Sequence, residues 1–188
     1  MHASRNAELS FGPNLILTGF MGTGKSTLGR AIAQAWKRPF RDTDKIIQER
    51  EGRTIPEIFA QDGEAAFRGL EKRCVEEWLP ESGAVISTGG GIVTIPGIAE
   101  RLRARGVVVA LFASPETILE RTRANKNRPL LQCEDPLARI RELLAARERA
   151  YMRSGVNVLT DRRPLEELVA IVTRVYRAAL RARERETR

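Results

Sequence analysis

The sequence predicts an α/β fold in which a parallel sheet is flanked by helices, within one domain that spans residues 1–188. Two observations predict this fold. Short apolar runs alternate with helical patterns along the chain, and the first apolar run ends in a glycine-rich loop. Short apolar runs bounded by turns are typical of buried parallel strands, and alternating strands and helices place helices on both faces of such a sheet. A chain of 188 residues is long enough for one full hydrophobic core.

The strands and helices can be assigned from these patterns. Four strands are expected at Leu15–Thr18, Ala84–Ser87, Val107–Phe112 and Val156–Leu159, and a fifth is expected to end near Asp42. The helical patterns are Ser26–Trp36, Asp44–Glu51, Thr54–Phe59, Glu64–Trp78, Pro96–Arg105, Pro115–Arg123, Pro136–Arg153 and Pro164–Arg185. Several of them have proline in or near the first turn, which is a common start of a helix.

The net charge of +8 has two readings. A basic surface can attract nucleic acid or small anions. However, residues 174–188 contain six Arg and two Glu, so they supply +4, half of the total. No basic patch interleaved with aromatic residues supports nucleic-acid binding. We therefore expect an anion-binding site and a solvated helical tail, with no nucleic-acid partner.

The sequence also bears on location. The apolar runs are much shorter than the ~20 residues that a membrane helix requires, and Met1–Ser10 is polar, without the apolar core of a secretory signal. Cys74 and Cys133 are in no metal-ligand spacing, which favours free thiols in a reducing compartment over a disulfide. We expect a monomeric cytoplasmic protein with no membrane partner.

The strongest motif is the loop Gly19–Thr27, which matches the pattern G-x-x-x-x-G-K-[ST] in full. Its glycines let successive N–H groups turn toward phosphate oxygens, and the following helix directs its N-terminal dipole at the same anion. Lys25 should reach the β- and γ-phosphates of ATP, and the Ser26 hydroxyl should hold Mg²⁺. The other nucleotide-binding candidates in the loop are Gly22, Thr23, Gly24 and Thr27. A chance Gly-Lys-Ser is the alternative, but the strand–loop–helix context favours a P-loop NTPase-type fold.

Two aspartates, Asp42 and Asp44, lie where the second strand should end. Ligands of open α/β sheets bind beyond the carboxyl ends of the strands, so both face the P-loop. Residues two apart in extended chain point the same way, so one carboxylate can approach Mg²⁺ while the other reaches a substrate hydroxyl. Alternatively, either aspartate caps the helix that follows. The runs that end at Ser87 and Phe112 do not end in an acid, so Asp42 is the best-placed carboxylate for a metal.

A glycine triplet and three arginines are further candidates. Gly89-Gly90-Gly91 follows a predicted strand and permits close backbone approach to a ligand, although a flexible loop is the alternative. Arg68 and Arg147 offer the forked geometry that matches a carboxylate. Arg128 lies in the non-periodic stretch Asn125–Asp135, where a lid would bring positive charge to a transferring phosphoryl group. A solvated surface role is the alternative for each arginine.

Together these motifs resemble a known family. They are Gly24–Thr27, Asp42-Thr43-Asp44, Phe59–Glu64 with Phe67-Arg68, Ser87–Gly91, Arg128–Leu131, and Arg147 with Tyr151. Their order and spacing resemble shikimate kinase, of the nucleoside monophosphate kinase-like P-loop group, from about residue 14 to 164. The resemblance implies phosphorylation of the 3-hydroxyl of shikimate by ATP, a step of aromatic amino acid biosynthesis. It also implies a substrate-binding helical segment at about 44–78 and a mobile lid at about 124–134.

The resemblance further implies roles for single residues. The implied catalytic residues are Lys25, Asp44 and Arg128, with Asp44 holding the reacting hydroxyl. The implied substrate-binding residues are Asp44, Arg68, Gly89, Gly90, Gly91 and Arg147, with Glu71 supporting the arginines. Ser26 and Asp42 would serve the metal, and Arg128 and Arg163 would join the P-loop in binding ATP. The chain departs from the family pattern near Asp161–Pro164, so Arg162 is an alternative to Arg163 at the adenine.

Two other classes compete with this interpretation. A gluconate or nucleotide kinase on the same fold would also use arginines, but the Asp-Thr-Asp element and the glycine triplet favour shikimate. A P-loop switch protein would need no paired aspartates at the acceptor position. An Arg-rich C-terminal helix is expected at about 164–188. Its part after Arg174 has no counterpart in the family, so the resemblance assigns it no function.

Overall fold

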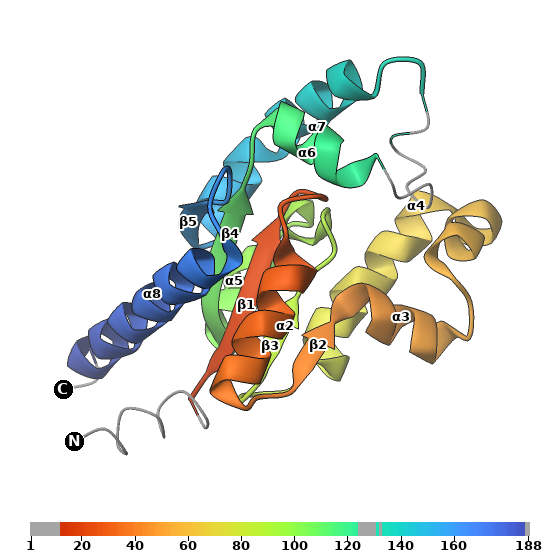
Figure 1. Ribbon diagram of the computed structural model, residues 1–188. Helices are drawn as coiled ribbons and strands as arrows, with labels where there is room; N and C mark the ends of the chain where they lie inside the picture. Colours follow the sequence, from red (N-terminus) through yellow and green to blue (C-terminus); the bar gives the residue numbers. More distant parts are fainter. Residues whose placement is uncertain (1–11, 124–130, 132, 187–188) are drawn as a thin grey trace.

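A computed structural model describes residues 12–123, 131 and 133–186 and confirms the predicted fold class (Figure 1). Its five strands are β1 (Asn14–Gly19), β2 (Phe40–Asp42), β3 (Val85–Ser87), β4 (Gly106–Phe112) and β5 (Val156–Leu159). They form one parallel sheet in the order β2-β3-β1-β4-β5. All five strands lie where the sequence predicted strands.

The helices also lie where they were predicted, with local differences. They are α2 (Lys25–Trp36), α3 (Thr43–Glu51), α4 (Ile55–Arg73), a π-helix η1 (Cys74–Trp78), a 3₁₀-helix η2 (Ile92–Thr94), α5 (Ile98–Arg105), α6 (Pro115–Thr122), α7 (Pro136–Ser154) and α8 (Leu165–Glu186). The two helices expected at 54–59 and 64–78 form α4 and η1, with a kink at Gly63 (φ 80°, ψ 175°). The expected start at Pro96 is wrong by two residues, because Gly97 precedes α5 in the left-handed region, with φ 79°.

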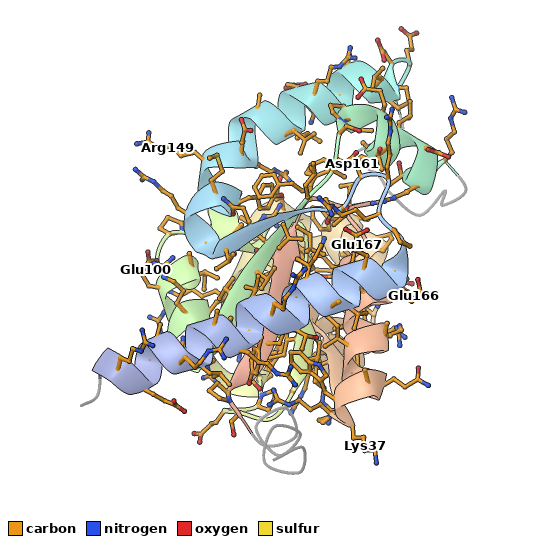
Figure 2. The ribbon with its side chains drawn as sticks, turned by 60° about the vertical axis from the view of Figure 1, so that its left-hand side comes forward. Lys37, Glu100, Arg149, Asp161, Glu166 and Glu167 are labelled. Atoms are coloured by element: carbon orange, nitrogen blue, oxygen red, sulfur yellow. The ribbon has the colours of Figure 1, made fainter. Side chains whose placement is uncertain are left out.

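The sheet separates two hydrophobic cores. Side chains alternate along a strand, so Leu15 and Leu17 of β1 pack into the core beneath α2 and α8, while Ile16 packs into the core on the other face. Figure 2 shows α8 crossing the sheet, with Glu166 and Glu167 near its N-terminal end. The opposite core includes side chains from α3, α4, α5 and α7. The sheet is therefore covered on both faces.

The strand register brings the functional segments to one edge of the sheet. Asp42 at the end of β2 pairs with Ser87 of β3, and Ser87 pairs with Leu17 of β1. The P-loop follows β1 directly. Because all strands are parallel, their carboxyl ends meet at this edge, where ligands of open α/β sheets bind.

Two findings bear on location. No helix of the described residues is long and apolar enough to span a membrane. Cys74 is buried, Cys133 is exposed, and both are free thiols, as expected.

Candidate active site

Two cavities open at the carboxyl edge of the sheet. The P-loop cavity, of about 560 Å³, is lined by Gly22–Leu28 together with Asp42, Ser87, Thr88, Arg121, Thr160, Arg163, Leu165 and Leu168. The arginine cavity, of about 590 Å³, is lined by Gln48, Thr54–Pro56, Phe59, Phe67, Arg68, Glu71, Gly89, Gly91 and Arg147. Met21, Asp44 and Gly90 line both cavities. A group bound in one cavity can therefore meet a group bound in the other at these three residues.

The P-loop cavity presents Lys25 at the first turn of α2. Lys25 is buried, and its Nζ donates hydrogen bonds of 2.8 Å to the carbonyl oxygens of Gly19 and Phe20. Its amine is thus held within the loop whose N–H groups form the phosphate cradle. Thr27 lies in the same first turn of α2 and also lines the cavity.

Ser26 and Asp42, the two residues predicted to serve a metal ion, are in contact with each other. The Ser26 hydroxyl donates to Asp42 Oδ2 at 3.0 Å, and it lies 3.2 Å from the hydroxyl of Ser87. Asp42 also caps α3, because its Oδ1 accepts a hydrogen bond of 3.1 Å from the backbone N–H of Asp44. The capping role of Asp42 is therefore confirmed, and its role toward a metal ion stays a prediction. Sequence reasoning placed Ser87 in the family motif Ser87–Gly91 but assigned it no role in the site.

Asp44 lies at the junction of the two cavities. A methyl group added at Gly89 would lie 2.7 Å from Asp44 Oδ1 and 2.6 Å from Glu71 Oε1. Two carboxyl groups thus approach the same point of the glycine triplet, one from α3 and one from α4. A side chain at position 89 would therefore require both carboxyl groups to shift.

The same constraint explains Gly91. A methyl group at Gly91 would overlap the guanidinium of Arg68. Gly89 and Gly91 are therefore favoured by close packing against charged side chains and not by an unusual backbone angle, since no glycine of the triplet has a positive φ.

Arg68 is held between two glutamates on α4. Its guanidinium forms ion pairs with Glu71 at 2.5 Å and with Glu64 at 2.8 Å. The Glu71 side chain is almost fully buried, and this burial raises its pKa to about 7. The positive charge of Arg68 lowers that pKa, but burial outweighs it, and the nearby charge of Asp44 raises the pKa further. The two glutamates thus hold the Arg68 guanidinium at the wall of the arginine cavity.

The remaining arginines divide between the two cavities. Arg147 of α7 lines the arginine cavity, with its guanidinium 5.9 Å from the ring centre of Phe20 in the P-loop. Arg163 lines the P-loop cavity and pairs with Glu167, whereas Arg162 lies in a neighbouring hollow. Arg128, and with it most of the expected lid at 124–134, lies outside the described residues.

Sequence reasoning missed Arg121. Its guanidinium donates to the hydroxyl of Thr160 at 3.0 Å and to the Thr160 carbonyl oxygen at 3.1 Å, and it lines the P-loop cavity. Nothing local distinguishes Arg121 from the many other arginines of the chain. Its position follows from the packing of α6 against the end of β5.

Fold and site define a class. A parallel sheet in the order 2-3-1-4-5, a P-loop with its lysine and serine, and an adjoining cavity with arginines and an aspartate are the parts of a P-loop kinase that acts on a small molecule.

Comparisons with known proteins identify the family. The family model described as Shikimate kinase matches residues 21–177. Shikimate kinase from Thermus thermophilus is 50% identical over 165 residues, which cover 87% of this chain and 90% of that protein. A structure of shikimate kinase from Acinetobacter baumannii in complex with shikimate superposes with a TM-score of 0.86 at 36% identity, over 93% of this chain and 98% of that one. The chain belongs to the shikimate kinase family. It is an ATP-using enzyme with shikimate kinase activity, which serves the shikimate pathway.

A more distant likeness concerns the fold alone. A gluconokinase structure from Sinorhizobium meliloti superposes with a TM-score of 0.51 at 20% identity, over 90% of this chain and 97% of that chain. The two proteins share the arrangement of the sheet and its helices. The choice between their substrates must therefore be argued from the residues of the site.

Proposed function

We propose that this chain transfers the γ-phosphoryl group of ATP to the 3-hydroxyl of shikimate, giving shikimate 3-phosphate and ADP. The observation that carries the proposal is the meeting of the two cavities at Met21, Asp44 and Gly90. ATP in the P-loop cavity would point its γ-phosphate at this junction, and shikimate in the arginine cavity would present a hydroxyl there. The reacting groups would thus be held in a near-attack arrangement.

The P-loop cavity suits the nucleotide with its metal. Lys25 and the loop N–H groups would bind the phosphates, Arg163 would lie toward the base, and Arg128 would add charge from the lid. Ser26 and Asp42 supply the hard oxygen ligands that Mg²⁺ prefers. The part of the chain that the structure describes contains no cluster of three His, Cys, Asp or Glu side chains for a metal ion. This fits Mg²⁺, which is commonly held by few protein ligands together with water and phosphate oxygens. When bound, the ion would neutralise charge on the phosphates.

The arginine cavity suits a small carboxylic acid with a ring. Arg68 and Arg147 would bind its carboxylate, since a guanidinium can make two parallel hydrogen bonds to that group. The backbone of Gly89–Gly91 would contact its hydroxyls, and Phe59 and Phe67 would cover its apolar ring. Asp44 would orient the attacking hydroxyl and accept its proton.

Three further features belong to the proposal. The segment at about 44–78 would form the substrate-binding part of one kinase domain, and the stretch at about 124–134 would close as a lid. We also propose a monomer that acts in the cytoplasm, which agrees with its two free cysteines.

A coupled assay of ADP release tests the proposed function. Shikimate, quinate, gluconate and nucleoside monophosphates are compared as acceptors at saturating ATP and Mg²⁺. We expect shikimate to give the highest kcat/KM. A higher value with gluconate or with a nucleoside monophosphate would overturn the proposal in favour of another acceptor on the same fold.

A further inference from the structure

Two buried hydroxyl groups hold the glycine triplet, and the mechanism proposed above uses neither of them. The side-chain oxygen of Thr43 accepts a hydrogen bond of 2.8 Å from the backbone N–H of Gly89. The hydroxyl of Tyr151 donates to the carbonyl oxygen of Gly90. Thr43 is fully buried and Tyr151 is 1% exposed, so water does not compete for these bonds.

These two bonds fix the orientation of the loop backbone. A peptide group is planar and trans, so its N–H and C=O point in opposite directions. When Tyr151 binds the Gly90 carbonyl, the N–H of Gly91 is turned the other way, and Thr43 sets the peptide plane before Gly89 in the same manner. Glycine has the greatest backbone freedom of any residue, so three glycines in a row need such outside contacts to keep one conformation.

The two hydroxyls also connect the loop to the other parts of the site. Thr43 lies on α3 between Asp42 and Asp44, and Tyr151 lies on α7 one turn beyond Arg147. The loop is therefore tied on one side to the aspartates and on the other to the helix of an arginine in the arginine cavity. Gly90 accepts the hydrogen bond from Tyr151 and directly follows the glycine that is bonded to Thr43. It lines both cavities.

Tyr151 is suited to act as a permanent donor. Burial raises its pKa to about 12, although the nearby positive charge of Arg147 lowers it. The hydroxyl therefore keeps its proton at any pH at which the enzyme works. Its ring packs edge-on against Phe112, with 6.3 Å between the ring centres, and this contact fixes the direction of the hydroxyl.

We propose that Thr43 and Tyr151 are positioning residues that clamp the Gly89–Gly91 loop from two sides, so that its backbone holds the acceptor against Asp44. This inference rests on the proposed function, because it assumes that the loop contacts the acceptor. Thr43, the central residue of the Asp-Thr-Asp element, and Tyr151 thus share one role, which is to hold the glycine loop in place.

Substitutions that remove only the hydroxyls test the clamp. Tyr151→Phe and Thr43→Val each leave a loop group without its partner, so the KM for shikimate should rise about tenfold while the KM for ATP stays within twofold. Thr43→Val is the more specific variant, because the Tyr151 hydroxyl also interacts with the Arg147 guanidinium. Thr43→Ser keeps the hydroxyl and should restore the KM for shikimate. Tyr176→Phe is the matched control, because Tyr176 is also buried and also donates to a carbonyl oxygen, that of Pro13 at 2.6 Å, far from the loop.

The outcomes separate the clamp from a purely structural role and from the proposed function. If Tyr151→Phe and Thr43→Val lower the melting temperature as Tyr176→Phe does but leave the KM for shikimate within twofold, the clamp is refuted. If one variant does not fold, the other decides by the same criterion. If the wild-type protein itself does not phosphorylate shikimate, the proposed function fails first and the clamp with it.

Discussion

At the scale of single residues, burial and neighbouring charges act in opposite directions on the ionisable groups of the site. Asp44, Glu71, Arg68 and Arg147 surround the arginine cavity, and two of the four are acids that approach the same glycine. The positive charges of Arg68 and Arg147 lower the pKa of Glu71. Burial penalises the charged form of Glu71 and raises this pKa by more than the two arginines lower it. A bound carboxylate would add further negative charge, so its binding depends on both arginines.

Glu71 should make the protein less stable as the pH rises. Its pKa of about 7 in the folded protein lies above the usual value of 4.5, so the folded state binds the extra proton between these pH values. The stability that this proton provides is complete below about pH 4.5 and is lost as the pH approaches 7, by about 3 kcal/mol at most. Chemical denaturation of the wild type and Glu71→Gln at pH 5 and pH 8 checks this. Between pH 5 and pH 8 the wild type should lose more unfolding free energy than Glu71→Gln. An equal change in both proteins would contradict the raised pKa of Glu71.

The two aspartates should respond differently to loss of charge. Asp44→Asn keeps the shape but removes the base, so kcat should fall about 10²- to 10⁴-fold with little change in ATP affinity. Asp42→Asn weakens the contact to Ser26 and should instead raise the Mg²⁺ concentration needed, with partial recovery at high metal. Steady-state kinetics at several Mg²⁺ concentrations distinguish the two. Metal rescue of Asp44→Asn but not of Asp42→Asn would reverse the roles.

Lysine should not replace either arginine of the arginine cavity. Arg68→Lys and Arg147→Lys each lose the forked pair of hydrogen bonds to a carboxylate, which costs about 1.5–3 kcal/mol, or roughly ten- to a hundredfold in kcat/KM for shikimate. The measurement is the kcat/KM of each variant, with Arg149→Lys as the control, since Figure 2 shows Arg149 on α7 pointing away from the body of the protein. An analogue of shikimate without its carboxylate that reacts as well as shikimate would refute the carboxylate-binding role.

At the scale of elements, α8 is fixed to the sheet by a buried cation. Arg38 donates to the carbonyl oxygen of Pro13 at 2.8 Å and to the hydroxyl of Tyr176 at 3.1 Å. Its guanidinium lies 5.3 Å from the ring centres of both Trp36 and Tyr176. The end of α2, the start of β1 and the middle of α8 therefore meet at one residue, at the edge of the sheet opposite the site.

Arg38→Met should weaken this junction without changing catalysis. The substitution keeps an apolar chain but removes the donors, so the free energy of unfolding should fall by about 1–3 kcal/mol. Urea denaturation gives that value, and kinetics should show KM values within twofold of the wild type. A large loss of activity with normal stability would show that this end of the sheet is coupled to the site.

Most elements could be predicted because each rests on a local pattern. The alternation of Leu15, Ile16 and Leu17, all apolar and all buried, is typical of a strand covered on both faces, and the proline at position 115 lies in the first turn of α6. The break expected between the helices at 54–59 and 64–78 is present as the kink at Gly63, whereas the π-helix after α4 could not be predicted, since it depends on how α4 packs. For the same reason neither Ser87 nor Arg121 was assigned a role at the site: their roles depend on strand register and helix packing, which no local pattern encodes.

At the scale of the molecule, the basic tail and the site are separate features. Arg174, Arg181 and Arg185 are exposed on α8, while Arg183 donates to the carbonyl oxygens of Arg103 and Gly106, each at 2.8 Å, near the start of β4. These contacts lie at the amino end of β4, away from both cavities. The expected C-terminal helix with exposed arginines is thus present, and in the proposed function the positive charge for phosphate binding comes from the P-loop and its neighbours.

The central claim is that the junction of the two cavities aligns one hydroxyl of shikimate with the γ-phosphate of ATP. The most direct test is the position of the phosphate in the product, determined by phosphorus and proton nuclear magnetic resonance after a complete turnover of shikimate with ATP and Mg²⁺. We expect a single ester at the 3-oxygen and one ADP for each molecule of product. Phosphate on another hydroxyl, or ADP released with free phosphate and unchanged shikimate, would contradict it.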